Sequence, residues 1–192
     1  MLRRSLLLAL LALAGCTTVA PLPGGPRNYR DELTLAGRMS VRYTEAGRPQ
    51  SVQGKFLWTQ YRDATDIELY SPLGQTIARI AITSGRARLE QSNGQVREAA
   101  SADALTEQAL GWSLPVTGLR YWLQGFVRDG DRLLAASPAT TETFRSDGWL
   151  LRYASWQQAG DQAVPKRIDF ERAGRGDALA IRIVIDRWGR GD

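Results

Sequence analysis

The chain has 192 residues, 25 Lys and Arg against 20 Asp and Glu, a formal net charge of +5, one cysteine and no histidine. These counts exclude Ser-His-Asp and Cys-His catalytic arrangements, and they exclude zinc sites of the usual nitrogen and sulfur ligands. The positive charges are scattered among acidic residues and no glycine-rich phosphate loop is present, so we expect no metal, no cofactor and no nucleic-acid partner.

The first fifteen residues have the layout of a secretory signal peptide. Arg3 and Arg4 precede an apolar run from Leu6 to Ala14, which is shorter than the about 20 residues that a membrane-spanning helix needs. The run ends in Leu13-Ala14-Gly15-Cys16, which resembles the lipobox of bacterial lipoproteins. We therefore predict that residues 1–15 are removed and that Cys16 carries lipid. The alternative is ordinary secretion after an A-x-A signal, which leaves Cys16 as a free thiol.

The residues after Cys16 have the composition of a tether. Thr17 to Pro26 contains three prolines and two glycines, and we assign residues 16–32 to the lipidated N-terminus and a flexible tether of about 30 to 40 Å. Thr17, rather than Asp, follows the cysteine, which resembles lipoproteins sorted to the outer membrane. Cleavage lowers the net charge from +5 to +3, a surplus that suits either a solvated surface or attraction to anionic lipid head groups.

A folded domain is predicted from residue 33 to residue 192, and it begins with strands. Apolar and polar residues alternate from Leu33 to Tyr43, and the same period of two returns around Trp58, Ile67, Ile80 and Leu89. Asn93-Gly94 is typical of a two-residue hairpin before a further strand at Val96. Six strands in succession with short links predict an antiparallel meander.

The period then changes to that of helices. Ser101 is a suitable cap for a helix that runs to about Gly111, and its apolar stripe includes Trp112. Thr117 is predicted to cap a second, short helix that Gly125 ends.

Strands return at Trp149–Tyr153, Ile168–Phe170 and Leu179–Ile185, with weaker signals near Leu133 and Phe144. A long antiparallel sheet buries its apolar face by curling or by accepting a cover. The sequence therefore predicts a mainly β fold, an open antiparallel half barrel covered by a helical lid.

Five segments resemble the LolB family of outer-membrane lipoprotein receptors. They are Leu35-Ala36-Gly37-Arg38, Gly54-Lys55-Phe56-Leu57-Trp58, Ser71-Pro72-Leu73-Gly74, Leu114-Pro115-Val116 followed by Tyr121-Trp122-Leu123-Gln124-Gly125, and Gly148-Trp149. The resemblance runs from about Leu33 to Trp188. It implies a half barrel that encloses an apolar cavity, accepts acylated lipoproteins from the periplasmic carrier LolA and inserts them into the outer membrane.

That function needs apolar shelter, because an acyl chain of about 16 carbons in water costs on the order of 10 kcal/mol. Candidates to line the cavity lie on the inward phase of the strands and on the helices: Met39, Val41, Phe56, Trp58, Ile67, Leu69, Leu119, Trp122, Ile181 and Ile183. The alternative for each of them is a packed core residue without contact to cargo.

Leu73 is a separate candidate. Ser71-Pro72-Leu73-Gly74 predicts a type I turn between two strands, where a polar tip is usual. In LolB-like proteins the leucine of this motif is implicated in delivery of cargo to the membrane. The alternative is a leucine folded back on its own sheet.

Several other classes of protein share parts of this pattern. An envelope scaffold shares the anchor and the sheet but needs no cavity, and a soluble LolA-like carrier lacks an anchoring cysteine. An envelope hydrolase needs converging carboxylates, whereas Glu68, Glu90, Asp169 and Asp186 fall on the outward phase of strands and are interpreted as solvated. We expect a monomeric, lipid-anchored receptor on the periplasmic side of the outer membrane, without enzymatic activity, whose partners are the carrier, lipoprotein cargo and outer-membrane lipid.

Overall fold

The computed structural model describes residues 27–110, 114–140, 142–173 and 178–190. The predictions for the signal peptide, for Cys16 and for the tether up to Pro26 lie outside the described residues. So do Gly111 and Trp112, which were predicted to close the first helix.

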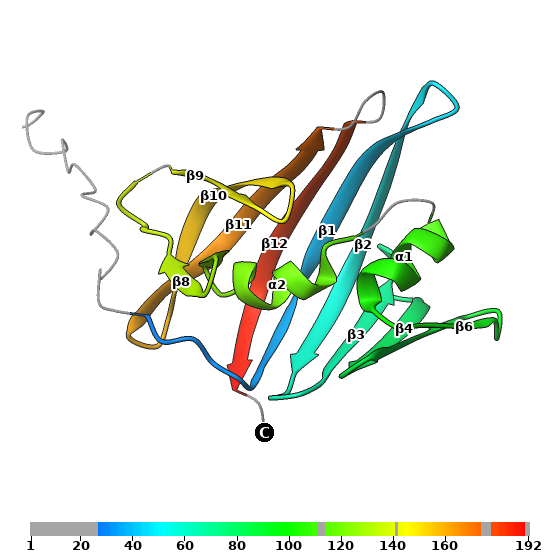
Figure 1. Cartoon of the computed structure of the whole chain (residues 1–192), viewed down its shortest axis with the longest axis horizontal. Coiled ribbons are helices and arrows are strands. Elements are labelled where there is room, and N and C mark those ends of the chain that lie inside the picture. The colour runs from blue at the N-terminus through cyan, green and yellow to red at the C-terminus, as the bar shows by residue number, and fades with distance from the viewer. Residues whose placement is uncertain (1–26, 111–113, 141, 174–177, 191–192) are drawn as a thin grey trace, which may run out of the picture.

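An open antiparallel sheet dominates the fold (Figure 1). In the described part of the chain it has ten strands, which are in spatial order β6 (Val96–Ala99), β5 (Arg86–Gln91), β4 (Thr76–Thr83), β3 (Thr65–Tyr70), β2 (Arg48–Gln60), β1 (Leu33–Glu45), β12 (Ala178–Arg190), β11 (Gln162–Ala173), β10 (Trp149–Ala159) and β9 (Thr143–Ser146). The predicted six-strand meander is confirmed, and the fold class with it.

The two halves of the sheet meet where the first strand pairs with the last. Val41 of β1 lies between Ile181 of β12 and Val52 of β2. Further along β1, its register with β12 shifts between Ala36 and Gly37, where Asp186 of β12 is the extra residue. A Cβ atom on Gly37 would lie 2.2 Å from the Val184 carbonyl oxygen, so only glycine allows this close approach.

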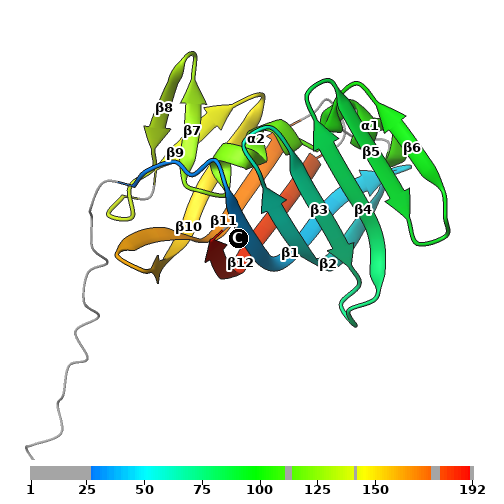
Figure 2. The same cartoon turned by 90° about the horizontal axis from the view of Figure 1, so that it is seen from below.

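Two short helices lie over one face of the sheet (Figures 1 and 2). They are α1 (Ala102–Leu110) and α2 (Val116–Trp122). Ser101 Oγ accepts a hydrogen bond of 3.1 Å from the Ala104 amide, which confirms the predicted cap of α1. Gly125, with a φ of 80°, follows the end of α2 as predicted. We call the face under the helices the covered face and the opposite one the open face.

The predicted cap of the second helix is wrong. Pro115 occupies the N-cap position of α2 and makes no side-chain cap. Thr117 lies inside the helix, and its amide donates to Asp103 Oδ1 of α1 over 3.3 Å. A carboxylate of the neighbouring helix therefore satisfies a free amide at the start of α2, which no local pattern reveals.

The hairpin at Asn93-Gly94 is present, but its loop has three residues rather than two. Gly94 donates to the Gln91 carbonyl oxygen, and Gln91 donates to that of Gln95, both over 2.9 Å. Gly94 has a φ of 81°, which an extra residue in the loop requires.

The weak strand signals near Leu133 and Phe144 belong to different sheets. Phe144 lies in β9 at the edge of the main sheet. Leu133 lies in β8 (Arg132–Ala135), which pairs with β7 (Phe126–Asp129) in a separate hairpin near β9 (Figure 2). Among the described residues, no helix is both long and apolar enough to cross a membrane.

Candidate functional site

The covered face brings together all ten residues that the sequence singled out as an apolar lining. Eight are buried, Met39 and Leu69 are half-buried, and the ten belong to one hydrophobic cluster between the sheet and the helices. The same cluster includes residues the sequence did not single out, among them Leu35, Leu105, Leu151 and Phe170. This continuous apolar layer is the one place in the described fold where helices cover a sheet.

Trp122 joins α2 to the second half of the sheet. Its side chain has no exposed area, and its ring meets that of Phe170 edge to face at 5.9 Å. Its carbonyl oxygen accepts a hydrogen bond of 3.2 Å from the Tyr153 hydroxyl, and burial raises the pKa of Tyr153, which keeps that hydroxyl a donor. Gly118, one turn earlier, leaves room for the indole, because a Cβ there would lie 2.5 Å from it.

One polar group of this layer stands out. Trp58 is 2% exposed, and its indole Nε1 has no hydrogen-bond partner among the described residues. A buried donor of this kind is costly unless something accepts its hydrogen bond. Composition and spacing predicted the apolar face of Trp58 but not this free N–H group.

The last residues of the predicted tether lie against the helical cover. We call residues 27–31 the strap. The Arg27 guanidinium lies 4.5 Å from the centre of the Trp156 ring and donates to the carbonyl oxygens of Ala136 and Ala163. The strap therefore contacts the β7–β8 region and the far half of the sheet before the chain enters β1.

The strap also contacts α2 directly. The Tyr29 hydroxyl accepts hydrogen bonds of 3.0 Å from Gln60 Nε2 and from Arg120 Nε. The Gln124 side chain accepts from the Arg30 amide over 2.9 Å and donates to the Arg30 carbonyl oxygen over 3.0 Å. The start of the domain is thus tied to the second lid helix.

The loop that carries Leu73 projects from the sheet. We call residues 71–75 the Leu73 loop. The Gly74 amide donates to the Ser71 carbonyl oxygen over 2.9 Å, and the Ser71 amide donates to that of Gln75 over 2.8 Å. Ser71 Oγ also accepts from the Gln75 amide over 3.2 Å. Leu73, at the tip of this well-connected turn, is 90% exposed.

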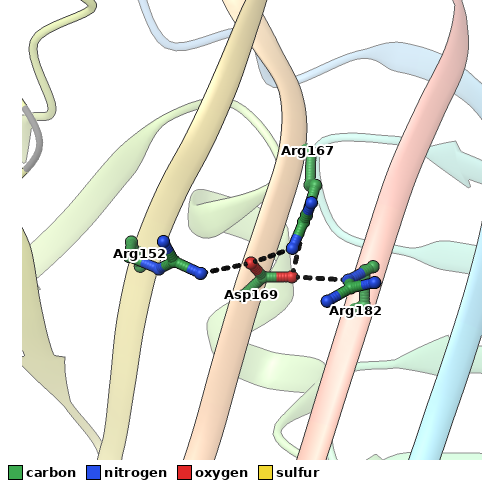
Figure 3. Close-up of polar contacts among 4 residues, drawn as sticks. All are labelled: Arg152, Arg167, Asp169 and Arg182. Carbon is green, nitrogen blue, oxygen red and sulfur yellow. Dashed lines mark hydrogen bonds and ion pairs between the residues drawn. The ribbon is translucent and has the colours of Figure 1, made fainter.

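The open face carries charged side chains in pairs and clusters. Around Asp169, three arginines converge, two from the neighbouring strands and one from its own strand β11 (Figure 3). Arg152 and Arg167 donate to Asp169 Oδ2 over 2.9 and 2.8 Å, and Arg182 donates to Oδ1 over 2.9 Å. Asp169 is 9% exposed, so the prediction that it is a solvated group is wrong. Neutralising partners on three strands make its burial tolerable.

This cluster makes stability depend on pH. Burial works to raise the pKa of the Asp169 carboxyl, but hydrogen bonds and positive charge from Arg167 and Arg182 outweigh burial and hold that pKa below its ordinary value. A carboxyl whose pKa is lower in the folded chain stabilises it above the unfolded pKa of about 3.9, and the contribution is lost as the pH falls through the folded pKa.

We expect Asp169→Asn to lower the free energy of unfolding at pH 7 by about 1–3 kcal/mol, because three guanidinium groups lose their shared partner. Urea unfolding at pH 7 and at pH 3 checks this, and the gap between the parent and the variant should narrow at pH 3. Asp186→Asn, which removes a more exposed carboxylate paired with Arg38, should cost less. If the difference in unfolding free energy between the parent and Asp169→Asn is the same at pH 7 and at pH 3, the pKa of Asp169 is not lowered in the folded chain.

Comparison with known proteins supplies the family. Residues 31–188 match the family described as outer membrane lipoprotein LolB. The chain is 38% identical to the outer-membrane lipoprotein LolB of Cupriavidus metallidurans over 195 residues, 96% of each chain. It is 40% identical to that of Cupriavidus pinatubonensis, over 96% of this chain and 94% of the relative. In fold alone, it is similar to a DUF1329 family protein from Desulfovibrio piger, with a TM-score of 0.50, 9% identity and coverage of 83% and 86%. The chain therefore belongs to the LolB family of outer membrane lipoproteins.

Proposed function

We propose that this chain is the membrane-bound acceptor of lipoprotein transport. It takes acylated lipoproteins from a LolA-like carrier in the periplasm and inserts them into the outer membrane. Membership of the LolB family supports this role. The single structural observation that carries it is the apolar layer under two short helices, which joins all ten predicted lining residues in one cluster.

Acyl chains would enter between the helices and the sheet. Moving such a chain out of water is favourable by about 0.8 kcal/mol per CH₂ group, so a long apolar face can hold it. Both helices are short, and α2 is joined to the sheet through Trp122 and Arg120 rather than through strand pairing. An acyl chain that enters between the helices and the sheet would displace them and break these contacts. The free N–H group of Trp58 would then donate to an ester or amide carbonyl of the cargo.

Membrane contact is assigned to Leu73 and the anchor to lipid on Cys16. Leu73 is 90% exposed, so its transfer from water into hydrocarbon is favourable. Three hydrogen bonds already fix its turn, so entry into the membrane costs little further conformational entropy. The strap places the exit of the tether beside the lid. A monomer suffices, since no step needs a second copy. The direction of transfer is set if this chain binds cargo more tightly than the carrier does.

Quenching of tryptophan fluorescence tests where the cargo binds. A lipoprotein whose acyl chains carry bromine should quench the chain more than the same lipoprotein without bromine, because Trp58 and Trp122 belong to the layer that the acyl chains would contact. A Trp58→Phe, Trp122→Phe variant should lose a large part of this extra quenching. Equal quenching with and without bromine contradicts acyl binding under the helices and favours an anchored scaffold.

A further inference from the structure

Next to the Leu73 loop, the open face has a recess whose wall includes three cationic side chains. The recess has a volume of about 310 Å³ and is lined by Arg38 of β1, Lys55 of β2 and Arg182 of β12, together with Pro72 of the loop. At about 30 Å³ per water, it has room for roughly ten waters, and so for a phosphate group. Ser40 and Gln53 add polar side chains to its wall.

Strand register explains why these cations lie together. Arg38 is directly opposite Lys55, and Lys55 is directly opposite Tyr70, the residue that precedes the Leu73 loop. Gly54 helps to bring β2 and this loop together, because a Cβ atom there would lie 2.7 Å from the Tyr70 carbonyl oxygen. The cationic wall is thus fixed at the base of the apolar tip.

Positive charge is in surplus around the recess. Arg38 shares Asp186 with Lys166, and Arg182 shares Asp169 with two further arginines. Lys55 is exposed and makes no ion pair within the described part of the chain. Two carboxylates therefore face five cations, and Lys55 adds a sixth positive charge with no partner.

We propose that this recess binds the phosphate of a phospholipid head group when the Leu73 loop enters the bilayer. Arginine and lysine are the usual ligands of phosphate in proteins. An apolar tip beside a cationic recess matches the surface of a bilayer, where phosphates lie directly above hydrocarbon, and neither free phosphate nor an acidic protein surface calls for the exposed leucine. This site adds a lipid phosphate as a ligand to the proposed function, and it rests on the proposal that Leu73 enters the membrane.

The test compares two charge reversals of equal size. The mature chain, residues 16–192, with Cys16→Ala and so without lipid, is mixed with vesicles of phosphatidylethanolamine containing one quarter phosphatidylglycerol, and the bound fraction is measured by sedimentation. Lys55→Glu removes the unpaired cation of the recess. Arg145→Glu makes the same change on β9, at the edge of the sheet, where the side chain is also exposed.

Lys55→Glu should weaken vesicle binding at least about tenfold, since each cation near an anionic surface contributes about fivefold in affinity. Arg145→Glu should weaken it less than threefold. Equal losses in the two variants overturn the site, because they indicate attraction by net charge alone. If glycerol 3-phosphate binds as tightly as vesicles do, the ligand is not a lipid surface. If Lys55→Glu leaves vesicle binding unchanged but abolishes binding to the carrier, the recess binds a protein surface instead.

The outcome is separable from that of the proposed function. If Lys55→Glu leaves vesicle binding unchanged while lipoproteins still pass from carrier to receptor, the phosphate site fails alone. If vesicle binding depends on Lys55 but no lipoprotein is received, the phosphate site stands and the proposed function fails.

Discussion

Leu73→Glu should reduce insertion of lipoproteins into membranes by about tenfold or more while leaving the fold and the receipt of cargo intact. Burial of a leucine side chain in hydrocarbon is worth about 1.5–3 kcal/mol, and a carboxylate in its place is costly to dehydrate. Leu73 is 90% exposed, so the free energy of unfolding should change by less than about 0.5 kcal/mol. The measurement is the fraction of cargo that passes from the receptor to vesicles.

Leu134→Glu is the matched control. It makes the same substitution at another exposed leucine, on β8 beyond the other end of the sheet. Insertion should stay near the level of the parent chain in this variant. If Leu73→Glu inserts cargo normally, or if both variants fail alike, the Leu73 loop is not the membrane contact.

Trp122→Ala should lower the free energy of unfolding by about 3–5 kcal/mol, the usual cost of truncating a fully buried aromatic side chain. The indole is completely buried, meets Phe170 and fills the space over Gly118. Since a domain of this size is stable by only about 5–15 kcal/mol, much of the margin depends on this one side chain. Urea unfolding measures the loss.

Trp122→Phe and Trp188→Ala calibrate the result. The first keeps an aromatic ring and should recover most of the stability, and the second truncates a half-buried tryptophan and should cost less. A loss under 1 kcal/mol in Trp122→Ala indicates an indole that lines open space rather than one that holds the lid to the sheet. Cargo binding should then fall without a loss of stability.

Local patterns were sufficient to predict most of the fold. Alternation with a period of two identified the six strands before the helices, and it placed residues such as Val41 and Ile181 on the covered face, where the register confirms them as direct neighbours. Ser101 and Gly125 were correct as helix signals because a cap and a left-handed residue act within one turn of the chain. The turn chemistry of its motif placed Leu73 at a loop tip but left open whether the side chain folds back on the sheet, and its 90% exposure is a finding of the structure.

Features that depend on distant partners were not predictable in this way. Asp103 reaches Thr117 only after both helices are packed, and Asp169 is buried only because Arg152 and Arg182 lie opposite it on neighbouring strands. A period of two gives the face of a side chain but not its neighbours across the sheet. The strap is a further case, since the contact of Tyr29 with Arg120 joins residues far apart in a sequence without regular pattern.

Transfer of a lipoprotein from its carrier distinguishes a receptor from an anchored scaffold. The mature chain, residues 16–192, with Cys16→Ala is mixed with radiolabelled lipoprotein bound to a LolA-like carrier, and the two proteins are then separated. We expect the label to move to the Cys16→Ala chain without nucleotide, as it should if the apolar layer under the helices binds acyl chains more tightly than the carrier does. A label that stays on the carrier would rule out the proposed function.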